Sequence, residues 1–309
     1  MNRREWLKSG VLAAGAPLLT GALIAAESTP AEGGKPELTL WQLPNQTKMQ
    51  MESFILLTRD DKLIVIDGGP EGDMDYLIQQ IKSIHPDGRV DYWLFTHIHL
   101  DHASGLAHIL KEHPDELKIG TVYCDFPTAE WVKGAEAGSY EISVEILKYF
   151  AKLPNCGKLP KNQPLKVGNV EITALNELND LDLDQPGLTV NDTSIVYRVK
   201  TPETTLLFLG DLYIHGQKRI VENQPAEAFK ADVVQMAHHG QNGVTKDFYE
   251  LVRPSACLWC APAWLWNNNI GPCDGSGPWK TIQTRAWMDD LGVKKHYVLK
   301  DGLVKLEFN

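Results

Sequence analysis

The sequence has no cluster of lysine and arginine residues, and its formal net charge is −10. Residues 1–26 contribute +2 to that charge, so residues 27–309 carry −12. A chain this acidic repels phosphate backbones over a Debye length of about 8–10 Å. Broad nucleic-acid binding needs lysine and arginine to displace counterions. We therefore expect a small-molecule substrate and do not expect nucleic acid as the main partner.

Long apolar runs are also scarce. One uncharged stretch, 9–26, approaches the length of a membrane span, and it follows the pair Arg3-Arg4. This arrangement is similar to a twin-arginine export signal. We expect residues 1–26 to be a signal segment that the twin-arginine export machinery recognises, with cleavage near Ala26 and a linker over 27–36. The protein would then be periplasmic or secreted, with no stable membrane span after processing; a membrane anchor is the alternative.

Cysteine is rare, with five residues, so at least one thiol is unpaired. Cys257 and Cys260 lie three residues apart in an apolar, strand-like run, where buried free thiols are common. An exported location permits disulfides. Two interpretations stay open, inert thiols or a structural disulfide that involves Cys260 or Cys273, and a metal site at this pair is not expected.

The sequence contains no nucleophilic serine elbow, no glycine-rich phosphate loop and no internal repeat. Its first half alternates strand-like and helical runs. Strands are expected over 38–43, 53–58, 62–66, 90–95 and 119–124, with helices over 74–84 and 103–111. An insertion is expected over 126–160, with a helix over 139–153. Further strands are expected over 165–175, 194–200, 205–209 and 232–236. Two strand-rich halves with helices predict an α/β fold, a four-layer αββα sandwich in one domain over 37–309.

Potential metal ligands follow the strand at 90–95. His97, His99, Asp101 and His102 fall within six residues. In an extended segment, the first three would project on one side, because side chains alternate along a strand. Imidazole and carboxylate are ligands that suit zinc, iron or manganese. Four such groups on one strand-to-helix loop have enough donors for two neighbouring metal ions.

Two later strands end in side chains of the same kind. Asp211 follows the apolar run 206–209, and His238 and His239 follow the strand at 232–236. Because the first motif also follows a strand, the pattern predicts that all these side chains converge at one edge of the sheets.

Together, His97-Ile-His99-Leu-Asp101-His102, Gly210-Asp211 and His238-His239-Gly240 resemble the motifs of the metallo-β-lactamase superfamily. The His-His-Gly variant, with Asn191-Asp-Thr-Ser194 before a strand, is similar to the hydrolase domain of the DNA-internalisation competence proteins. It also resembles the bacterial phosphorylcholine esterases.

The resemblance implies a set of ligands. His97 and His99 would hold a first metal ion, Asp101 and His102 a second, and Asp211 would bridge the two. One of His238 and His239 would complete the second site; we favour His239, with His238 facing the substrate. Asn191 stands where many members supply a third histidine to the first metal, so that site is expected to be weaker or completed by water or substrate.

The function expected from this resemblance is that of an exported metal-dependent hydrolase. One or two zinc ions, with manganese or iron as alternatives, would generate a metal-bound hydroxide. Asp101 would orient the water, and His238 would donate a proton or a hydrogen bond to the substrate. A small phosphodiester is the favoured substrate. A lactone or thioester is the alternative, as is a non-catalytic binding module with a vestigial metal site, whereas Asn191 disfavours β-lactam cleavage. The tryptophan-rich segment 259–287 would either stack on a ligand or pack beneath a loop.

Overall fold

The computed structural model describes residues 24–25, 34–271 and 273–309. Most of the predicted signal segment and linker therefore lies outside the described residues. The exception in the signal segment is β1 (Ile24–Ala25), which pairs with the last strand of the chain. Within the described residues, no helix is both long enough and apolar enough to cross a membrane.

The first sheet has eight strands in the order β1-β15-β2-β3-β4-β5-β6-β7. Its strands after β1 are β2 (Leu38–Gln42), β3 (Phe54–Thr58), β4 (Leu63–Ile66), β5 (Arg89–Leu94), β6 (Lys118–Tyr123), β7 (Cys156–Gly157) and β15 (Val304–Phe308). The pairs from β4 to β7 are parallel, and β15, β2, β3 and β4 are antiparallel neighbours. The chain thus returns to its first sheet at the end.

The second sheet has seven strands in the order β14-β13-β12-β11-β10-β9-β8. They are β8 (Leu165–Val167), β9 (Val170–Ala174), β10 (Tyr197–Lys200), β11 (Thr205–Phe208), β12 (Val233–Gln235), β13 (Ala256–Trp259) and β14 (Lys295–Val298). The pairs from β11 to β14 are parallel. Both sheets therefore have a parallel half whose strands all end at one edge.

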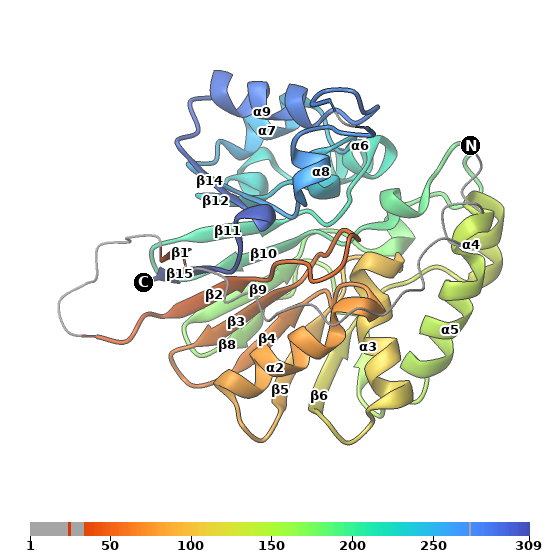
Figure 1. Cartoon of the computed structure of the whole chain (residues 1–309), viewed down its shortest axis with the longest axis vertical. Helices are drawn as coiled ribbons and strands as arrows, with labels where there is room; N and C mark the ends of the chain where they lie inside the picture. The colour runs from red at the N-terminus through yellow and green to blue at the C-terminus, as the bar shows by residue number, and fades with distance from the viewer. Residues whose placement is uncertain (1–23, 26–33, 272) are drawn as a thin grey trace.

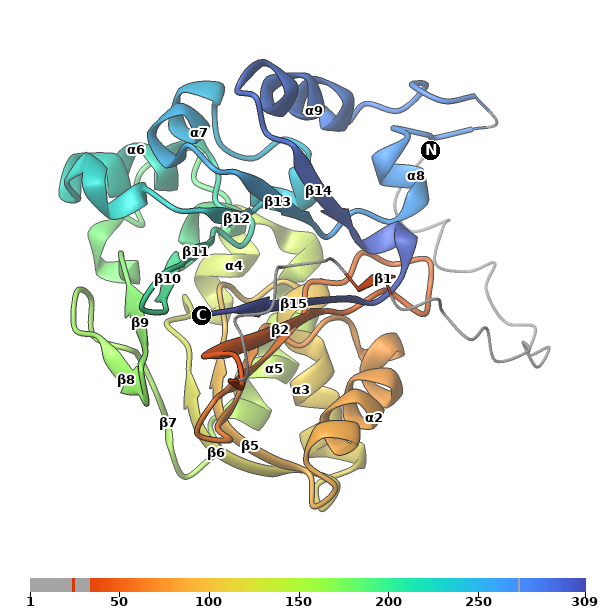
Figure 2. The ribbon, with the colours of Figure 1, turned by 90° about the vertical axis from the view of Figure 1, so that its left-hand side faces the viewer.

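Helices cover the outer face of each sheet. They are α2 (Met74–Ile84), α3 (Leu100–Glu112), α4 (Ala129–Ala135), α5 (Tyr140–Phe150), α6 (Ile214–Asn223), α7 (Lys246–Val252), α8 (Ala263–Trp266) and α9 (Thr281–Asp290). In Figure 1 the helices α2, α3 and α5 flank the first sheet, and α6, α7 and α9 lie on the far side of the second. The turned view in Figure 2 shows the two sheets between these helical layers. This is the αββα sandwich that the sequence predicts.

The two sheets pack through apolar side chains. The rings of Phe54 and Phe208, one from each sheet, have centroids 5.1 Å apart in an edge-to-face arrangement. All four residues of β4 and of β13 are buried, because each of these strands is covered on both faces. Polar bonds also cross the interface, for example from the Tyr197 hydroxyl to the Phe95 carbonyl (2.9 Å) and from the Gln42 amide to the Trp259 carbonyl (2.8 Å). The interface is thus an apolar core with few polar groups, of which Oε1 of Gln42 is buried with no hydrogen-bond partner among the described residues.

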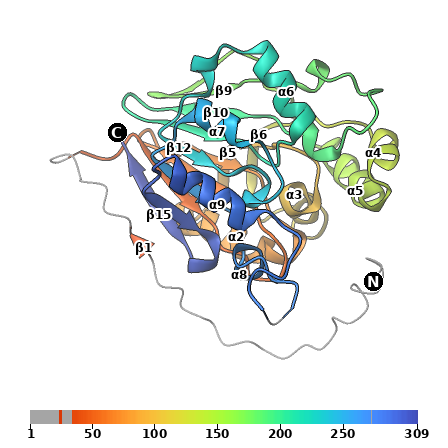
Figure 3. The ribbon, with the colours of Figure 1, turned by 90° about the horizontal axis from the view of Figure 1, so that it is seen from above.

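The expected strand over 165–175 is wrong in one respect, since the structure has two strands there. β8 and β9 form an antiparallel hairpin around Gly168, whose φ is +60°. Glycine adopts a positive φ at little steric cost, so Gly168 allows the turn between the two strands. The segment 126–160, predicted as an insertion, contains α5 where a helix is expected and one further helix, α4, whose first turn is capped by the Thr128 side chain. Seen from above in Figure 3, α4 and α5 lie beside α3.

Candidate metal centre

The histidine run lies between β5 and α3. His97 is fully buried, and His99 is the residue that precedes the first turn of α3. The amides of His102 and Ala103 donate to the His99 carbonyl at 3.2 and 2.9 Å, so Asp101 and His102 already belong to the helix. The expectation of one extended segment through Asp101 is therefore wrong. The helical turn nevertheless directs His102 back toward His97, with ring centroids 4.1 Å apart.

Asp211 comes from the second sheet, directly after β11. Gly210 has a φ of +54°, and a Cβ atom there would lie 2.6 Å from Cβ of Thr96. Only glycine allows this close approach of the two chain segments. The Asp211 amide donates to the Ser194 hydroxyl at 3.2 Å, which fixes the turn. The second sheet thereby brings its carboxylate against the histidines of the first.

His238 and His239 follow β12 in an unusual backbone conformation. Their φ angles are 51° and 55°, and both residues are left-handed. Such a conformation costs a non-glycine residue roughly 1–2 kcal/mol and is found mostly at functional sites. The His238 amide donates to the Gly210 carbonyl at 3.0 Å, which holds the turn against β11. The strained turn presents two adjacent imidazoles to the same carboxylate.

The two oxygens of Asp211 face different histidines. Oδ1 lies 3.2 Å from Nε2 of His102 and 3.5 Å from Nε2 of His239. Oδ2 lies 3.8 Å from Nε2 of His97 and 3.7 Å from Nε2 of His238. Asp211 therefore stands between two sets of nitrogen donors, as a bridging ligand requires.

The donors form two groups, and the ligand atoms within each group lie within 4.8 Å of one another. His97, His99 and Asp211 form the first, where Nε2 of His97 lies 3.0 Å from Nδ1 of His99. The second group contains Glu52, His102, Asp211 and His239. Asp101 adjoins the second group, with its Oδ2 atom 3.2 Å from Nε2 of His239. All the ligands predicted from the sequence thus come together at one edge of the sandwich.

The second ring nitrogen of several histidines has its own partner. Nδ1 of His102 lies 2.8 Å from the Asp67 carboxylate, which also accepts from the Thr96 amide and hydroxyl. Nε2 of His99 lies 3.0 Å from the Glu136 carboxylate. An imidazole that donates to a carboxylate keeps its other nitrogen free as a ligand. These contacts therefore fix which nitrogen of each ring faces the centre.

The donor set fits a divalent cation. Among the described residues, several buried polar atoms here have no hydrogen-bond partner: Nε2 of His102, Nε2 of His239, Oδ1 of Asp211 and Oε2 of Glu52. An unpartnered buried polar group is costly, and a cation would satisfy all four atoms. Imidazole and carboxylate suit zinc, iron and manganese alike.

The electrostatics of the metal-free centre support the same conclusion. Burial opposes charge on His102 and His239, but the Asp211 carboxylate outweighs it. The pKa of His102 is therefore well above its usual range, and the pKa of His239 is raised to about 9. Burial, together with the charge of His102, lowers the pKa of His97 well below its usual range. Protons on two imidazoles thus balance the carboxylates where a divalent cation would supply the same charge.

Glu52 is a member of the site that the sequence did not indicate. It lies just before β3, is 1% exposed, and places Oε2 3.5 Å from Nδ1 of His239. Its amide donates to the Asp101 carbonyl at 3.0 Å. Burial raises the pKa of the Glu52 carboxyl to about 8. The available signal was a single carboxylate two residues before the apolar strand β3.

Asn191 is near the site but not in either donor group. Its Nδ2 lies 3.3 Å from Nε2 of His238, while its Oδ1 atom is buried without a partner. Nδ1 of His238 lies 3.0 Å from the Asn242 carbonyl and so carries the proton. The His238 side chain is partly exposed to solvent, at 21%. The first donor group consequently has two imidazoles, from His97 and His99, and no third one from position 191.

The tryptophan-rich segment packs rather than opening a stacking platform. Trp259 is fully buried. Trp264 and Trp279 contact each other with centroids 4.8 Å apart, and the Trp264 indole donates to the Lys48 carbonyl at 3.0 Å. Arg285 lies over the Trp266 ring, 4.4 Å from its centroid.

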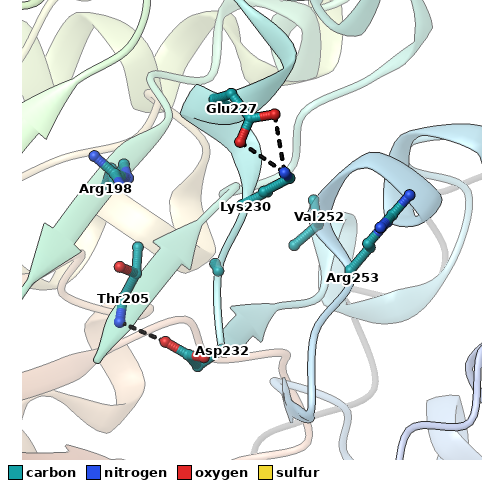
Figure 4. A pocket seen from close by; sticks show the side chains of 8 residues that line it. Arg198, Thr205, Glu227, Lys230, Asp232, Val252 and Arg253 are labelled. Carbon is teal, nitrogen blue, oxygen red and sulfur yellow. Dashed lines mark hydrogen bonds and ion pairs between the residues drawn. The ribbon is translucent and has the colours of Figure 1, made fainter. Parts of the chain in front are cut away.

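A surface hollow of about 470 Å³ lies elsewhere. Figure 4 shows its charged lining, in which Lys230 pairs with Glu227 and the Thr205 amide donates to Asp232. Thr205 begins β11, whereas Asp211 follows the end of that strand. The hollow is thus at the opposite end of the strands from the histidines.

Comparison with known proteins places these observations in a family. Residues 50–255 match the model of the metallo-beta-lactamase superfamily. No curated protein sequence matches the chain. The metallo-beta-lactamase fold protein YhfI from Bacillus subtilis has a TM-score of 0.51 at 12% identity, over 87% of this chain and 100% of that one. A diphosphatase from the PhnP family has a TM-score of 0.46 at 12% identity, over 88% and 98%. At these identities the structural likeness concerns the fold.

Proposed function

Since the chain belongs to the metallo-β-lactamase superfamily, we propose that it is a metal-dependent hydrolase that cleaves a small phosphodiester. The observation that carries the proposal is the position of Asp211 between two donor groups. Each of its oxygens faces a different pair of imidazoles. Two cations that share one carboxylate are suited to in-line displacement at phosphorus, because both the attacking and the leaving oxygen are stabilised. We propose one or two zinc ions, with manganese or iron as alternatives.

The nature of the substrate follows from charge and from Asn191. Residues 27–309 carry a net charge of −12, which favours a small substrate over a long polyanion. Asn191 adds no third imidazole to the first donor group, and this argues against β-lactam cleavage. The proposal agrees with the resemblance of the His-His-Gly motif to the DNA-internalisation competence proteins and the phosphorylcholine esterases.

The chain's own residues would act around the substrate as follows. Bound cations lower the pKa of water to about 7 and polarise the electrophile. His97, His99, Asp101, His102, Asp211 and His239 would hold these cations. Asp101, which adjoins His239 at the rim, would accept a hydrogen bond from the attacking water and orient it.

His238 would handle the proton. Its Nδ1–H donates to the Asn242 carbonyl, so Nε2 carries the lone pair, which lies 3.3 Å from the Asn191 amide nitrogen and 3.7 Å from Oδ2 of Asp211. Burial, with the charge of His239, lowers the pKa of His238 despite nearby Asp211, which keeps the ring neutral at pH 7. The neutral Nε2 atom would take the proton that the water loses and return it to the leaving oxygen.

The biological setting is also part of the proposal. We propose that residues 37–309 form one catalytic domain with the segment 126–160 as an insertion. Residues 1–26 would direct the chain through the twin-arginine machinery to the periplasm or the medium. The arginine pair and the uncharged stretch after it support this localisation.

The test combines metal analysis with a substrate panel. Purified full-length protein is expected to contain one or two equivalents of zinc, manganese or iron, and to hydrolyse bis-p-nitrophenyl phosphate faster than an acyl lactone or nitrocefin. Chelation should abolish turnover, and the same metal should restore it. His99→Ala is expected to lose activity, while His108→Ala, within α3 and paired with Glu71, should keep it.

Each other outcome rejects part of the proposal. Faster turnover of the lactone would replace the phosphodiester with an ester substrate on the same site. Protein that stays free of metal and inactive, yet binds a partner, would favour a binding module instead.

A further inference from the structure

Two cysteines meet at the edge of the first sheet, away from the histidines. Cys124 follows β6, and Cys156 begins β7, the strand that pairs with it. Their Sγ atoms lie 3.6 Å apart, and the Cys124 amide donates to the Gly157 carbonyl at 2.8 Å. Cys156 is exposed and Cys124 is half-buried, so reagents in solution reach the pair.

The other cysteines are placed differently. Cys257 and Cys260 are buried thiols in and after β13, and the Gln42 amide donates to Cys260. Burial raises the pKa of both thiols, which makes them unreactive. Cys273 is exposed. Within the described part of the chain, Cys124 and Cys156 are the two thiols in contact with each other.

The segment between these two cysteines makes up most of the proposed insertion at 126–160. It contains α4, α5 and Glu136, whose carboxylate lies 3.0 Å from Nε2 of His99. β7 has two residues and pairs with one neighbour at the edge of the sheet. The attachment of the insertion to the sheet therefore depends on few backbone hydrogen bonds.

We propose that Cys124 and Cys156 form a disulfide in an oxidising environment, and that this bond fastens the base of the insertion to the first sheet. The contact with Cys124 lowers the pKa of the Cys156 thiol, which favours it as the attacking thiolate. With a disulfide such as oxidised glutathione, Cys156 attacks one sulfur and releases one glutathione thiol. Cys124 then displaces the second glutathione from the mixed disulfide. Two protein thiols are oxidised, and one glutathione disulfide is reduced to two thiols.

The inference is independent of metal chemistry and is tested by mass spectrometry. Full-length protein is incubated with oxidised glutathione, alkylated and digested. We expect the intact mass to fall by two hydrogens and one linked peptide to join Cys124 to Cys156. The oxidised form should melt roughly 5 °C above the reduced form, and trypsin should cut within 126–160 more slowly.

The control variants separate this pair from the remaining thiols. Cys156→Ser should abolish both the mass change and the rise in Tm, whereas Cys273→Ser should leave both intact. A linkage through Cys273, or full alkylation of Cys124 and Cys156 after oxidation, would reject the disulfide. A disulfide that forms without raising the Tm or slowing proteolysis would reject its fastening role.

Discussion

Asp211 connects the two halves of the sandwich because each of its oxygens faces donors from both sheets. Oδ1 lies between His102 and His239, and Oδ2 between His97 and His238. No other side chain of the described centre has this position in both donor groups. The chemistry proposed above therefore depends more on this residue than on any single histidine.

Replacing Asp211 by asparagine keeps the shape of the side chain but removes its charge and one oxygen. We expect the metal content to fall below one equivalent and kcat/KM for bis-p-nitrophenyl phosphate to fall more than about 100-fold. This loss exceeds the one expected for a residue that only hydrogen-bonds a metal ligand. Elemental analysis and steady-state kinetics measure the two effects. A variant that retains full metal and activity would show that Asp211 is not a bridging ligand.

Glu52 is the member of the second donor group that no motif of the sequence indicated. Its carboxylate faces Nδ1 of His239, and it is the one acidic residue of the site that precedes β3. Glu52→Gln preserves size but replaces one of the carboxyl oxygens beside Nδ1 of His239 with an amide nitrogen. We expect zinc or manganese affinity to weaken by about 10–100-fold in calorimetric titration.

Glu37→Gln is the matched control for that variant. Glu37 is also buried, but it pairs with Arg59 at 2.7 Å on the first sheet and not with the centre. Its metal affinity should match that of the unchanged protein. Equal affinities for all three proteins would mean that Glu52 serves only the packing beneath the site.

At the scale of the elements, the position of α3 depends on one glycine. A Cβ atom at Gly105 would lie 2.3 Å from the Gly68 carbonyl oxygen and 3.0 Å from that of Gly69. The Gly105 amide also donates to the Gly69 carbonyl at 2.9 Å. The first turns of α3, which carry Asp101 and His102, thus lie directly on the loop after β4.

Gly105→Ala should therefore push α3 away from that loop. We expect a loss of about 1–3 kcal/mol in the free energy of unfolding and weaker metal binding, because His102 moves with the helix. Denaturant unfolding and metal titration measure both. Gly134→Ala, in α4 with no atom within 4 Å of its Cβ, should instead stabilise the protein by about 0.5–1 kcal/mol. A neutral Gly105→Ala variant would contradict the close packing.

The elements also show how far the sequence alone reaches. The strand runs and the residues that follow β5, β11 and β12 were predictable, because parallel strands end at one edge and their periodicity is plain. The start of α3 at Leu100 was not predictable, because a histidine run has no apolar periodicity. The first helical turn depends on hydrogen bonds to the His99 carbonyl, which the sequence does not indicate. Glu52 lies 187 residues from His239, and Glu136 lies 37 residues from His99. Each pair meets only through tertiary packing, which no local pattern encodes.

For the whole molecule, the buried site must be stable with and without its cation. Metal-free protein buries several carboxylates beside protonated imidazoles, so its stability depends on protons that a cation displaces. The pKa of His239 rises from 6.5 to about 9 on folding, and that of Glu52 rises from 4.5 to about 8. Metal-loaded protein has no such protons to lose.

The metal-free protein should therefore lose stability as the pH rises. A group whose pKa is raised by folding contributes stability that is complete below its unfolded pKa and is lost as the pH passes its folded pKa. The loss falls between pH 4.5 and about pH 8 for Glu52 and between pH 6.5 and about pH 9 for His239, which together give a window from pH 4.5 to about pH 9. We expect the Tm of chelator-treated protein to fall across this window, and that of zinc-loaded protein to change less. Glu52→Gln removes one titrating group, so its metal-free Tm should fall less steeply, whereas a metal-free Tm that rises with pH would contradict the assignment of both protons.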